Sequence, residues 1–242
     1  MKKNLSGQVA LVTGGSKGIG LGVAHALIAQ GMHVAITGRH QDTLSSAERE
    51  LSGAGPGRCL ALDVDVRDFD AVSRAVTTIT TTFGGLDVVV NNAGVGVFAK
   101  VAEMSPQQWA DVIDTNLTGV FNVTRATLEA LRLRGGGYIL NVSSLAGRNT
   151  FVGAAAYCAS KAGLNAFGET LMLEVRHDNI KVTTIAPGSV ATSFSGMNAG
   201  SDADWKIAPA DIGEMVVDLL LMDSRTLPSY VEMRPSKPPR KS

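Results

Sequence analysis

A tyrosine and a lysine stand four residues apart in the sequence, at Tyr157 and Lys161. If the segment that carries them is helical, their side chains project from the same face of the helix, one turn apart. An ammonium group beside a phenol favours the phenolate, which otherwise forms only around a pKa of about 10. Such a pair could deliver a proton to a substrate or remove one near neutral pH.

A glycine-rich segment from Gly14 to Gly20 is the second chemical signal. Glycines at a strand-to-helix junction let the backbone approach a pyrophosphate, whose charge is met by free N–H groups and the helix dipole. The spacing differs from the dinucleotide fingerprint G-x-G-x-x-G, and no Gly-Lys-Ser/Thr triplet ends the segment, which argues against a P-loop. By itself, the segment could also be a purely structural turn.

The rest of the chain must provide the elements that position these residues. Short apolar runs alternate with longer amphipathic segments, which is the pattern of βαβ units and a parallel sheet. We expect strands at about residues 9–13, 33–37, 59–62, 86–90, 138–142, 181–185 and 230–233. We expect helices at about residues 19–30, 42–51, 68–82, 107–131, 154–175 and 211–222.

Polar or turn-forming residues follow four of the predicted strands, where a parallel sheet presents its carboxyl ends to ligands. Besides the glycine-rich segment, these are residues 91–94, the pair Ser143 and Ser144, and residues 187–188. Asn116 lies within a predicted helix, where Asn is a poor choice unless its amide is needed. Together these positions predict a ligand crevice at one edge of the sheet.

Composition sets the class of protein. The chain has 242 residues, 45% hydrophobic and 18% charged, with a formal net charge of zero, so it fits one globular α/β domain. This balance argues against a nucleic-acid partner, and no apolar run is long enough for a membrane span. The two cysteines, Cys59 and Cys158, form no ligand cluster, so we expect no metal site and a cytoplasmic location.

Six segments, taken in order, resemble the short-chain dehydrogenase/reductase family, including its 3-oxoacyl-[acyl-carrier-protein] reductases, from the first strand to about residue 192. They are Thr13-Gly14-Gly15-Ser16-Lys17-Gly18-Ile19-Gly20, Asn91-Asn92-Ala93-Gly94, Asn116, Ser144, Tyr157-x-x-x-Lys161 and Pro187-Gly188-Ser189-Val190-Ala191-Thr192. The resemblance implies a single Rossmann-like, doubly wound domain over residues 1–234, with a parallel sheet of about seven strands flanked by helices. Residues 235–242, which are rich in proline and basic side chains, would form a flexible tail.

The resemblance also implies a reaction, hydride transfer between a nicotinamide cofactor and a carbonyl or secondary alcohol. Tyr157 would act as the general acid and base, with Lys161 beside it. Ser144 would donate a hydrogen bond to the substrate oxygen, and Asn116 would support a water chain behind Lys161. Asn116 could instead simply bond to the backbone, and Ser143 is interpreted as structural.

The end of the second predicted strand bears on the cofactor. NAD enzymes usually place an acidic residue there, whereas Arg39 offers a planar fork suited to the 2′-phosphate, and Lys17 could add a second positive charge. We therefore predict NADP(H), although Arg39 could also stack on adenine or face solvent. Asp65 and Val66 resemble the adenine-contacting pair, with Asp63 as a competing candidate. Cofactor contacts are thus predicted at Gly14, Gly15, Ser16, Lys17, Gly18, Ile19, Gly20, Arg39, Asp65, Val66, Asn92, Ala93, Gly94, Tyr157, Lys161, Pro187, Gly188, Val190 and Thr192.

The substrate is less clearly indicated. Residues 193–208 contain several small side chains and could form a lid, with Phe194, Met197 and Trp205 either lining a pocket or packing the lid onto the body. A 3-oxoacyl thioester or a small ketone fits the resemblance, but residues 230–236 depart from the family's usual Asp-Gly-Gly ending. The alternative is a dinucleotide-binding sensor or scaffold of the same fold without catalysis.

The helix predicted over residues 154–175 is apolar on most of its circumference, although a helix that covers a sheet should be polar on its outer side. We therefore expect the outer face to be buried in a homo-oligomer, a dimer or a tetramer; a homotetramer is the form that we predict from the resemblance.

Overall fold

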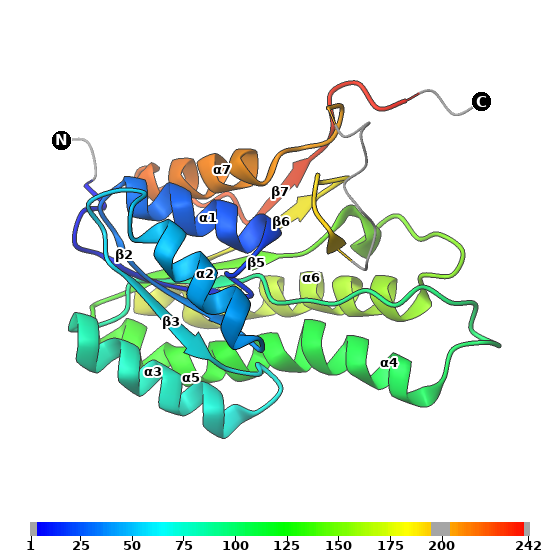
Figure 1. Cartoon of the computed structure of the whole chain (residues 1–242), viewed down its shortest axis with the longest axis horizontal. Coiled ribbons are helices and arrows are strands. Elements are labelled where there is room, and N and C mark those ends of the chain that lie inside the picture. Colours follow the sequence, from blue (N-terminus) through cyan, green and yellow to red (C-terminus); the bar gives the residue numbers. More distant parts are fainter. Residues whose placement is uncertain (1–3, 195–203, 240–242) are drawn as a thin grey trace.

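Seven parallel strands form one sheet in the computed structural model, which describes residues 4–194 and 204–239 (Figure 1). The strands are β1 (Val9–Thr13), β2 (His33–Gly38), β3 (Cys59–Asp63), β4 (Val88–Asn91), β5 (Gly137–Val142), β6 (Ile180–Pro187) and β7 (Tyr230–Met233). Their order across the sheet is β3-β2-β1-β4-β5-β6-β7, and every neighbouring pair is parallel. The order reverses between β1 and β4, so the prediction of a doubly wound, Rossmann-like sheet is confirmed.

Helices cover both faces of the sheet, and each face has its own core. On one face, α1 (Gly18–Ala29), α2 (Gln41–Leu51) and α7 (Pro209–Leu221) pack against the sheet, and on the other lie α3 (Phe69–Phe83), α5 (Gly119–Leu133) and α6 (Ala155–Val175). Successive residues of β1 alternate between the two cores, because side chains of a strand point to opposite faces. Both faces are therefore buried, which explains the continuous apolar strands in the sequence.

The helix expected over residues 107–131 is interrupted. It begins as α4 (Pro106–Ile113), passes through a five-residue π-helical stretch (Asp114–Thr118) and continues as α5. Ser105 and Gln108 form a reciprocal capping box at its start, with Pro106 at the first helical position. The π-helical stretch contains Asn116, and such local widening of a helix is frequent at functional sites.

Strand β4 starts two residues later than expected, and the side chain of Asp87, just before it, joins two other elements. Its carboxylate accepts a hydrogen bond from the backbone N–H of Val9 at 2.8 Å and pairs with Arg134 at 2.9 Å. Asp87 therefore joins the start of β1 to the end of α5. The other expected elements differ from the observed ones by only a few residues at their ends.

The parallel strands bring the four predicted strand ends to one edge of the sheet, on the right in Figure 1. Residues 14–20 follow β1, Asn91 ends β4, Ser144 follows β5 and Pro187 ends β6. Residues 234–239 form no helix or strand, and within the described ranges no helix is long and apolar enough to cross a membrane.

Candidate active site

The side chains of Ser144, Tyr157 and Lys161 meet where β5 ends and α6 begins. Tyr157 lies in the first turn of α6, and Ser144 bonds to its hydroxyl from the end of β5. The Lys161 Nζ lies 5.9 Å from the centre of the Tyr157 ring, one helical turn away, as the sequence spacing predicted. The Ser144 Oγ also accepts a hydrogen bond from the backbone N–H of Ala146 at 3.1 Å, which orients the hydroxyl.

The ionisation of this group differs from the expectation. Burial raises the pKa of the Tyr157 phenol above its ordinary value, and the bond to Ser144 lowers it only in part. Lys161 was expected to favour the phenolate, but its Nζ donates instead to the carbonyl oxygen of Val142 at 2.9 Å. Burial lowers the pKa of Lys161 to about 8, so its charge is itself costly in this site.

Asn116 is completely buried and ties two parts of the site together. Its Nδ2 donates to the carbonyl oxygen of Val95 at 2.9 Å and to the Ser160 Oγ at 3.0 Å, while its Oδ1 accepts from the N–H of Val95 at 2.8 Å. The amide thus joins the loop after β4 to α6 beside Lys161. The alternative interpretation of Asn116, bonding to backbone, accounts for two of these three contacts, both with Val95.

The turn between β1 and α1 is built so that only glycine fits at several positions. Gly14 and Gly18 have φ angles of +63° and +54°, in the left-handed region that other residues rarely adopt. A Cβ on Gly20 would lie against the carbonyl oxygen of Gly14, and one on Gly15 would lie 2.7 Å from the Ile36 side chain. The backbone therefore passes close to both neighbouring elements and leaves the start of α1 open.

A network centred on Thr13 holds this turn against the loop after β4. The Thr13 Oγ1 accepts hydrogen bonds from the backbone N–H groups of Asn92 and Ala93, both at 3.0 Å. The Asn92 side chain donates back to the carbonyl oxygens of Thr13 and Gly14 at 2.9 and 3.1 Å. Asn92, expected as a cofactor contact, uses its amide group here to position the glycine-rich turn. The role of Thr13 was missed, although the residue directly precedes that turn.

Arg39 follows β2 and is exposed, with its guanidinium 4.0 Å from the Asp65 carboxylate. That carboxylate is bonded mainly to Arg67, at 2.7 Å, and the Arg67 side chain holds the pKa of Asp65 below its usual range. The competing candidate, Asp63, is exposed at the end of β3, opposite Gly38 in the sheet. Arg39, Asp63 and Asp65 therefore all lie at the carboxyl ends of the neighbouring strands β2 and β3.

Two further residues predicted to contact the cofactor, Val66 and Gly188, lie just beyond β3 and β6 and are held there by hydrogen bonds of their backbone groups. Val66 is buried, and its carbonyl oxygen accepts a hydrogen bond from Asn122 at 3.0 Å. The N–H of Gly188, just beyond Pro187, donates to the carbonyl oxygen of Met233 at 2.8 Å.

The remaining predicted contacts lie beside the glycine-rich turn. The Thr192 methyl group lies 3.2 Å from the place where a Cβ on Gly18 would be, and Val190 pairs with Ile207. Ser16 is half-buried with its hydroxyl 3.5 Å from the Thr43 hydroxyl, Lys17 is exposed just before α1, and Ile19 packs against the core. Gly94 lies against the Asn116 amide.

The region predicted as a lid is described only in part, and Met197 lies outside the described residues. Phe194 packs against Tyr157, with ring centres 5.7 Å apart. Trp205 instead lines an open hollow of about 670 Å³, together with Asp211 and the tail residues Pro235 and Lys237. The two candidate pocket residues that the structure describes therefore lie in different surroundings.

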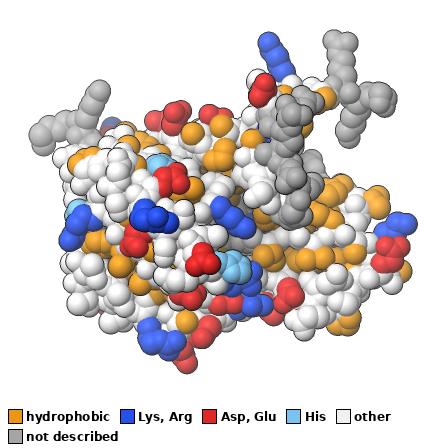
Figure 2. Space-filling view, viewed as in Figure 1, with side chains coloured by type: hydrophobic (Ala, Val, Ile, Leu, Met, Phe, Trp, Pro, Cys, Tyr) orange, Lys and Arg blue, Asp and Glu red, His pale blue; other side chains and the backbone are white. Residues whose placement is uncertain are grey.

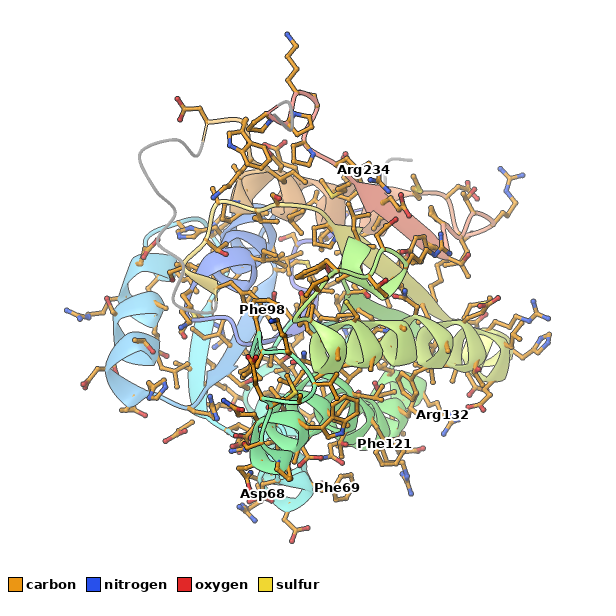
Figure 3. All side chains as sticks on the ribbon, turned by 90° about the vertical axis from the view of Figure 1, so that its right-hand side faces the viewer. Asp68, Phe69, Phe98, Phe121, Arg132 and Arg234 are labelled. Carbon is orange, nitrogen blue, oxygen red and sulfur yellow. The ribbon has the colours of Figure 1, made fainter. Side chains whose placement is uncertain are left out.

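Sequence analysis missed two aromatic side chains beside Tyr157. Phe98, labelled in Figure 3, meets the Tyr157 ring edge-on at a centre distance of 5.7 Å, and Phe151 lies 5.8 Å from Phe98. Both lie in loops that follow predicted strands, β4 and β5. Their position after strands that end at the crevice was the available signal, because loops there line the site.

Comparison with known proteins gives relatives along almost the whole chain. It is 36% identical over 206 residues to the 3-oxoacyl-[acyl-carrier-protein] reductase FabG of Chlamydia muridarum, covering 85% of this chain and 83% of the relative. It is 33% identical to the glycine betaine reductase ATRR of Emericella nidulans over 98% of this chain, but spans only 19% of that relative's length.

Solved structures agree with these matches. A metagenomic short-chain oxidoreductase in complex with NADP is 35% identical, with a TM-score of 0.85 and coverage of 98% of this chain and 100% of that one. An alcohol dehydrogenase from the archaeon Thermococcus sibiricus, complexed with 5-hydroxy-NADP, is 28% identical, with a TM-score of 0.89 and coverage of 97% and 99%. The family model described as short chain dehydrogenase matches residues 8–202. With that match and the doubly wound sheet, the chain belongs to the short-chain dehydrogenase family.

Proposed function

We propose that this oxidoreductase transfers hydride between NADP(H) and a carbonyl or secondary alcohol, with Tyr157 exchanging the proton. The observation that carries the proposal is the half-buried phenol of Tyr157, bonded to Ser144 at the sheet edge where the glycine-rich turn also lies. Reduction of a carbonyl needs a hydride at carbon and a proton at oxygen. The nicotinamide supplies the hydride when it is bound.

The residues at the sheet edge fit such a cofactor. The tight glycine backbone from Gly14 to Gly20 leaves the free N–H groups of the first turn of α1 for a pyrophosphate. Thr192 lies beside this turn, and Arg39 with Lys17 would neutralise a 2′-phosphate. The prediction of NADP(H) agrees with the similar structures solved with NADP and 5-hydroxy-NADP.

The chain's own groups then account for the proton. Because burial raises the pKa of Tyr157, the phenol keeps its proton until a carbonyl oxygen with growing negative charge lies beside it. The Ser144 hydroxyl donates a hydrogen bond to the same oxygen as that charge develops. Lys161 donates to Val142 while the phenol is neutral, but its Nζ is only 5.9 Å from the ring centre, so its charge would stabilise the phenolate once the proton has left. Asn116 holds the α6 segment that carries both side chains through Ser160.

Cofactor choice is tested by replacing Arg39 with Glu. The variant loses a charge-assisted bond to the 2′-phosphate, and its carboxylate repels that phosphate. We therefore expect the NADPH-to-NADH ratio of kcat/KM to fall by about 10- to 100-fold. Steady-state kinetics with both cofactors measures the ratio. Arg49→Glu makes the same charge change at an exposed position near the far end of α2 and should leave the ratio unchanged. A wild-type preference for NADH would refute NADP(H) as the cofactor.

Homo-oligomerisation is part of the proposal. Apolar side chains are exposed on both α5 and α6: Phe121, labelled in Figure 3, is 50% exposed on α5, and on α6 Leu173 is 52% exposed and Ala159 and Ala162 are also exposed. A second copy would bury this apolar surface, giving a dimer or, with a second interface, a tetramer. Light scattering at micromolar concentration is expected to give a multiple of the chain mass, and a monomeric mass would contradict the proposal.

A further inference from the structure

Two phenylalanines pack against Tyr157 and a third packs against one of them, and the three come from segments that follow three different strands. Phe98 lies in the loop after β4, Phe151 in the loop after β5 and Phe194 beyond β6; we call these three the aromatic collar. Phe98 and Phe194 each lie with their ring centre 5.7 Å from that of Tyr157, and Phe151 stands behind Phe98 at 5.8 Å. The phenol therefore opens into an aromatic environment.

The first two loops of the collar are joined by their backbone. The N–H of Ala99 donates to the carbonyl oxygen of Gly153 at 2.9 Å, which holds Phe98 and Phe151 side by side. A backbone bond between two loops fixes the relative position of their side chains without using any polar side chain. The collar is thus a built feature of the site rather than an accidental contact of two chain segments.

The collar leaves apolar surface open to solvent. Phe98 is 41% exposed and Phe151 is 53% exposed, and Val101 and Val152 in the same two loops are also exposed. Figure 2 shows hydrophobic side chains gathered at the right-hand end of this face, where the loops after β4 and β5 lie in Figure 1. Contiguous apolar surface at the mouth of a site marks a place where an apolar partner binds.

Charged side chains of the same loops pair with other groups of the protein. Lys100 and Glu103 lie 4.0 Å apart and pair with each other, and the Arg148 guanidinium stacks on the Tyr230 ring at 3.8 Å. Arg148 also lies 3.7 Å from Glu232. These charged side chains have partners within the protein but stay largely exposed, whereas the rings that pack directly against Tyr157 are those of Phe98 and Phe194.

We propose that the aromatic collar selects ketones whose carbonyl carries an extended apolar substituent, an alkyl chain or an aryl ring. The inference rests on the proposed reduction, because a carbonyl oxygen must reach the hydroxyls of Tyr157 and Ser144. A substituent on that carbonyl then lies against the rings that flank the phenol, where each buried methylene contributes favourable transfer free energy. A small polar carbonyl compound leaves the rings in water and gains nothing from them.

The test is a series of methyl ketones lengthened by one methylene at a time, with acetophenone as the aryl member, assayed with NADPH. In the wild type, kcat/KM is expected to rise by about fourfold for each added methylene until the collar is covered. Phe98→Ala and Phe151→Ala should flatten this dependence, and Phe98→Leu should restore part of it because leucine keeps apolar surface. A dependence on chain length that is unchanged in both alanine variants would overturn the proposal.

Phe69→Ala is the matched control. Phe69 is 41% exposed, like Phe98, but it lies on α3 at a distance from the collar, as Figure 3 shows. This variant removes the same amount of exposed aromatic surface and should keep the wild-type dependence on chain length. Phe69 and Phe98 are both partly exposed, so we expect the alanine variants to fold. Thermal unfolding of each variant checks this.

A second measurement separates the collar from the reaction. Calorimetric titration of the same ketones into Tyr157→Phe loaded with NADPH measures binding without turnover, and the dissociation constant should fall by a similar factor for each methylene. If all ketones are reduced equally well and bind equally well, the collar proposal is wrong and the reaction stands. If no ketone is reduced but affinity rises with chain length, the collar proposal stands and the reaction is wrong.

Discussion

Replacement of Tyr157 by Phe is expected to lower kcat/KM for a reducible ketone by about 10²- to 10⁴-fold, the usual size of a general acid contribution. The change removes only the hydroxyl, so the ring keeps its contacts with Phe98 and Phe194 and the helix α6 keeps its start. Binding of NADPH should persist, because the glycine-rich turn is untouched. Loss of NADPH absorbance measures turnover, and a fluorescence titration measures cofactor affinity.

Tyr138→Phe is the control for removal of a buried tyrosine hydroxyl. Tyr138 lies in β5, and its hydroxyl bonds to the Thr183 hydroxyl at 2.7 Å within the sheet. Its loss is expected to cost about 1 kcal/mol of stability and to leave kcat/KM close to that of the wild type. Equal activity of Tyr157→Phe and the wild type would remove Tyr157 from the mechanism. Tight NADPH binding by the wild type without turnover of a broad ketone panel would favour a sensor or scaffold.

Replacement of Lys161 by Met is expected to change how stability depends on pH. Burial lowers the pKa of Lys161 to about 8 in the folded chain, while the ordinary value for an unfolded chain is 10.5. Above about pH 8 the folded chain releases this proton first, so the unfolded chain binds more protons and the free energy of unfolding rises with pH. Between about pH 7 and about pH 9.5 the wild type should gain about 2 kcal/mol relative to Lys161→Met.

Urea unfolding of the two proteins at several pH values measures this difference, in which titrations common to both proteins cancel. Lys100→Met, at an exposed position, controls for the loss of a lysine and should run parallel to the wild type. Parallel pH profiles of Lys161→Met and the wild type would mean that the buried amine does not titrate in this range. Lys161→Met should also lose most of its reductase activity, because the phenolate of Tyr157 would lack its neighbouring cation.

The fold was predictable because its signals are local. Buried parallel strands give continuous apolar runs such as Val9–Thr13, and amphipathic helices between them give a different period. The π-helical stretch at Asp114–Thr118 was not predicted, because one extra residue in a helical turn barely changes the apolar period. The two contacts of the Asp87 side chain, with Val9 and Arg134, could not be read from the sequence because both partners lie on other elements.

The candidate site was predictable in its members but not in its electrostatics. The Tyr157 and Lys161 spacing, the glycine-rich turn and the strand ends could all be read as patterns. The direction of the pKa shift of Tyr157 could not, because it depends on burial by Phe98 and Phe194, which come from distant segments. The use of Asn92 to hold the turn also depends on a contact across 78 residues.

By itself, the sequence determined the parallel α/β architecture and the presence of a tyrosine and a lysine one helical turn apart. Both follow from short-range periodicity, which sets secondary structure and the side of a helix that each residue occupies. Only the tertiary structure decided that Lys161 donates to Val142, that burial favours the neutral phenol of Tyr157, and that Phe98 and Phe194 pack against its ring with Phe151 behind Phe98. Burial and contact between distant segments set these properties, and neither has a period along the chain.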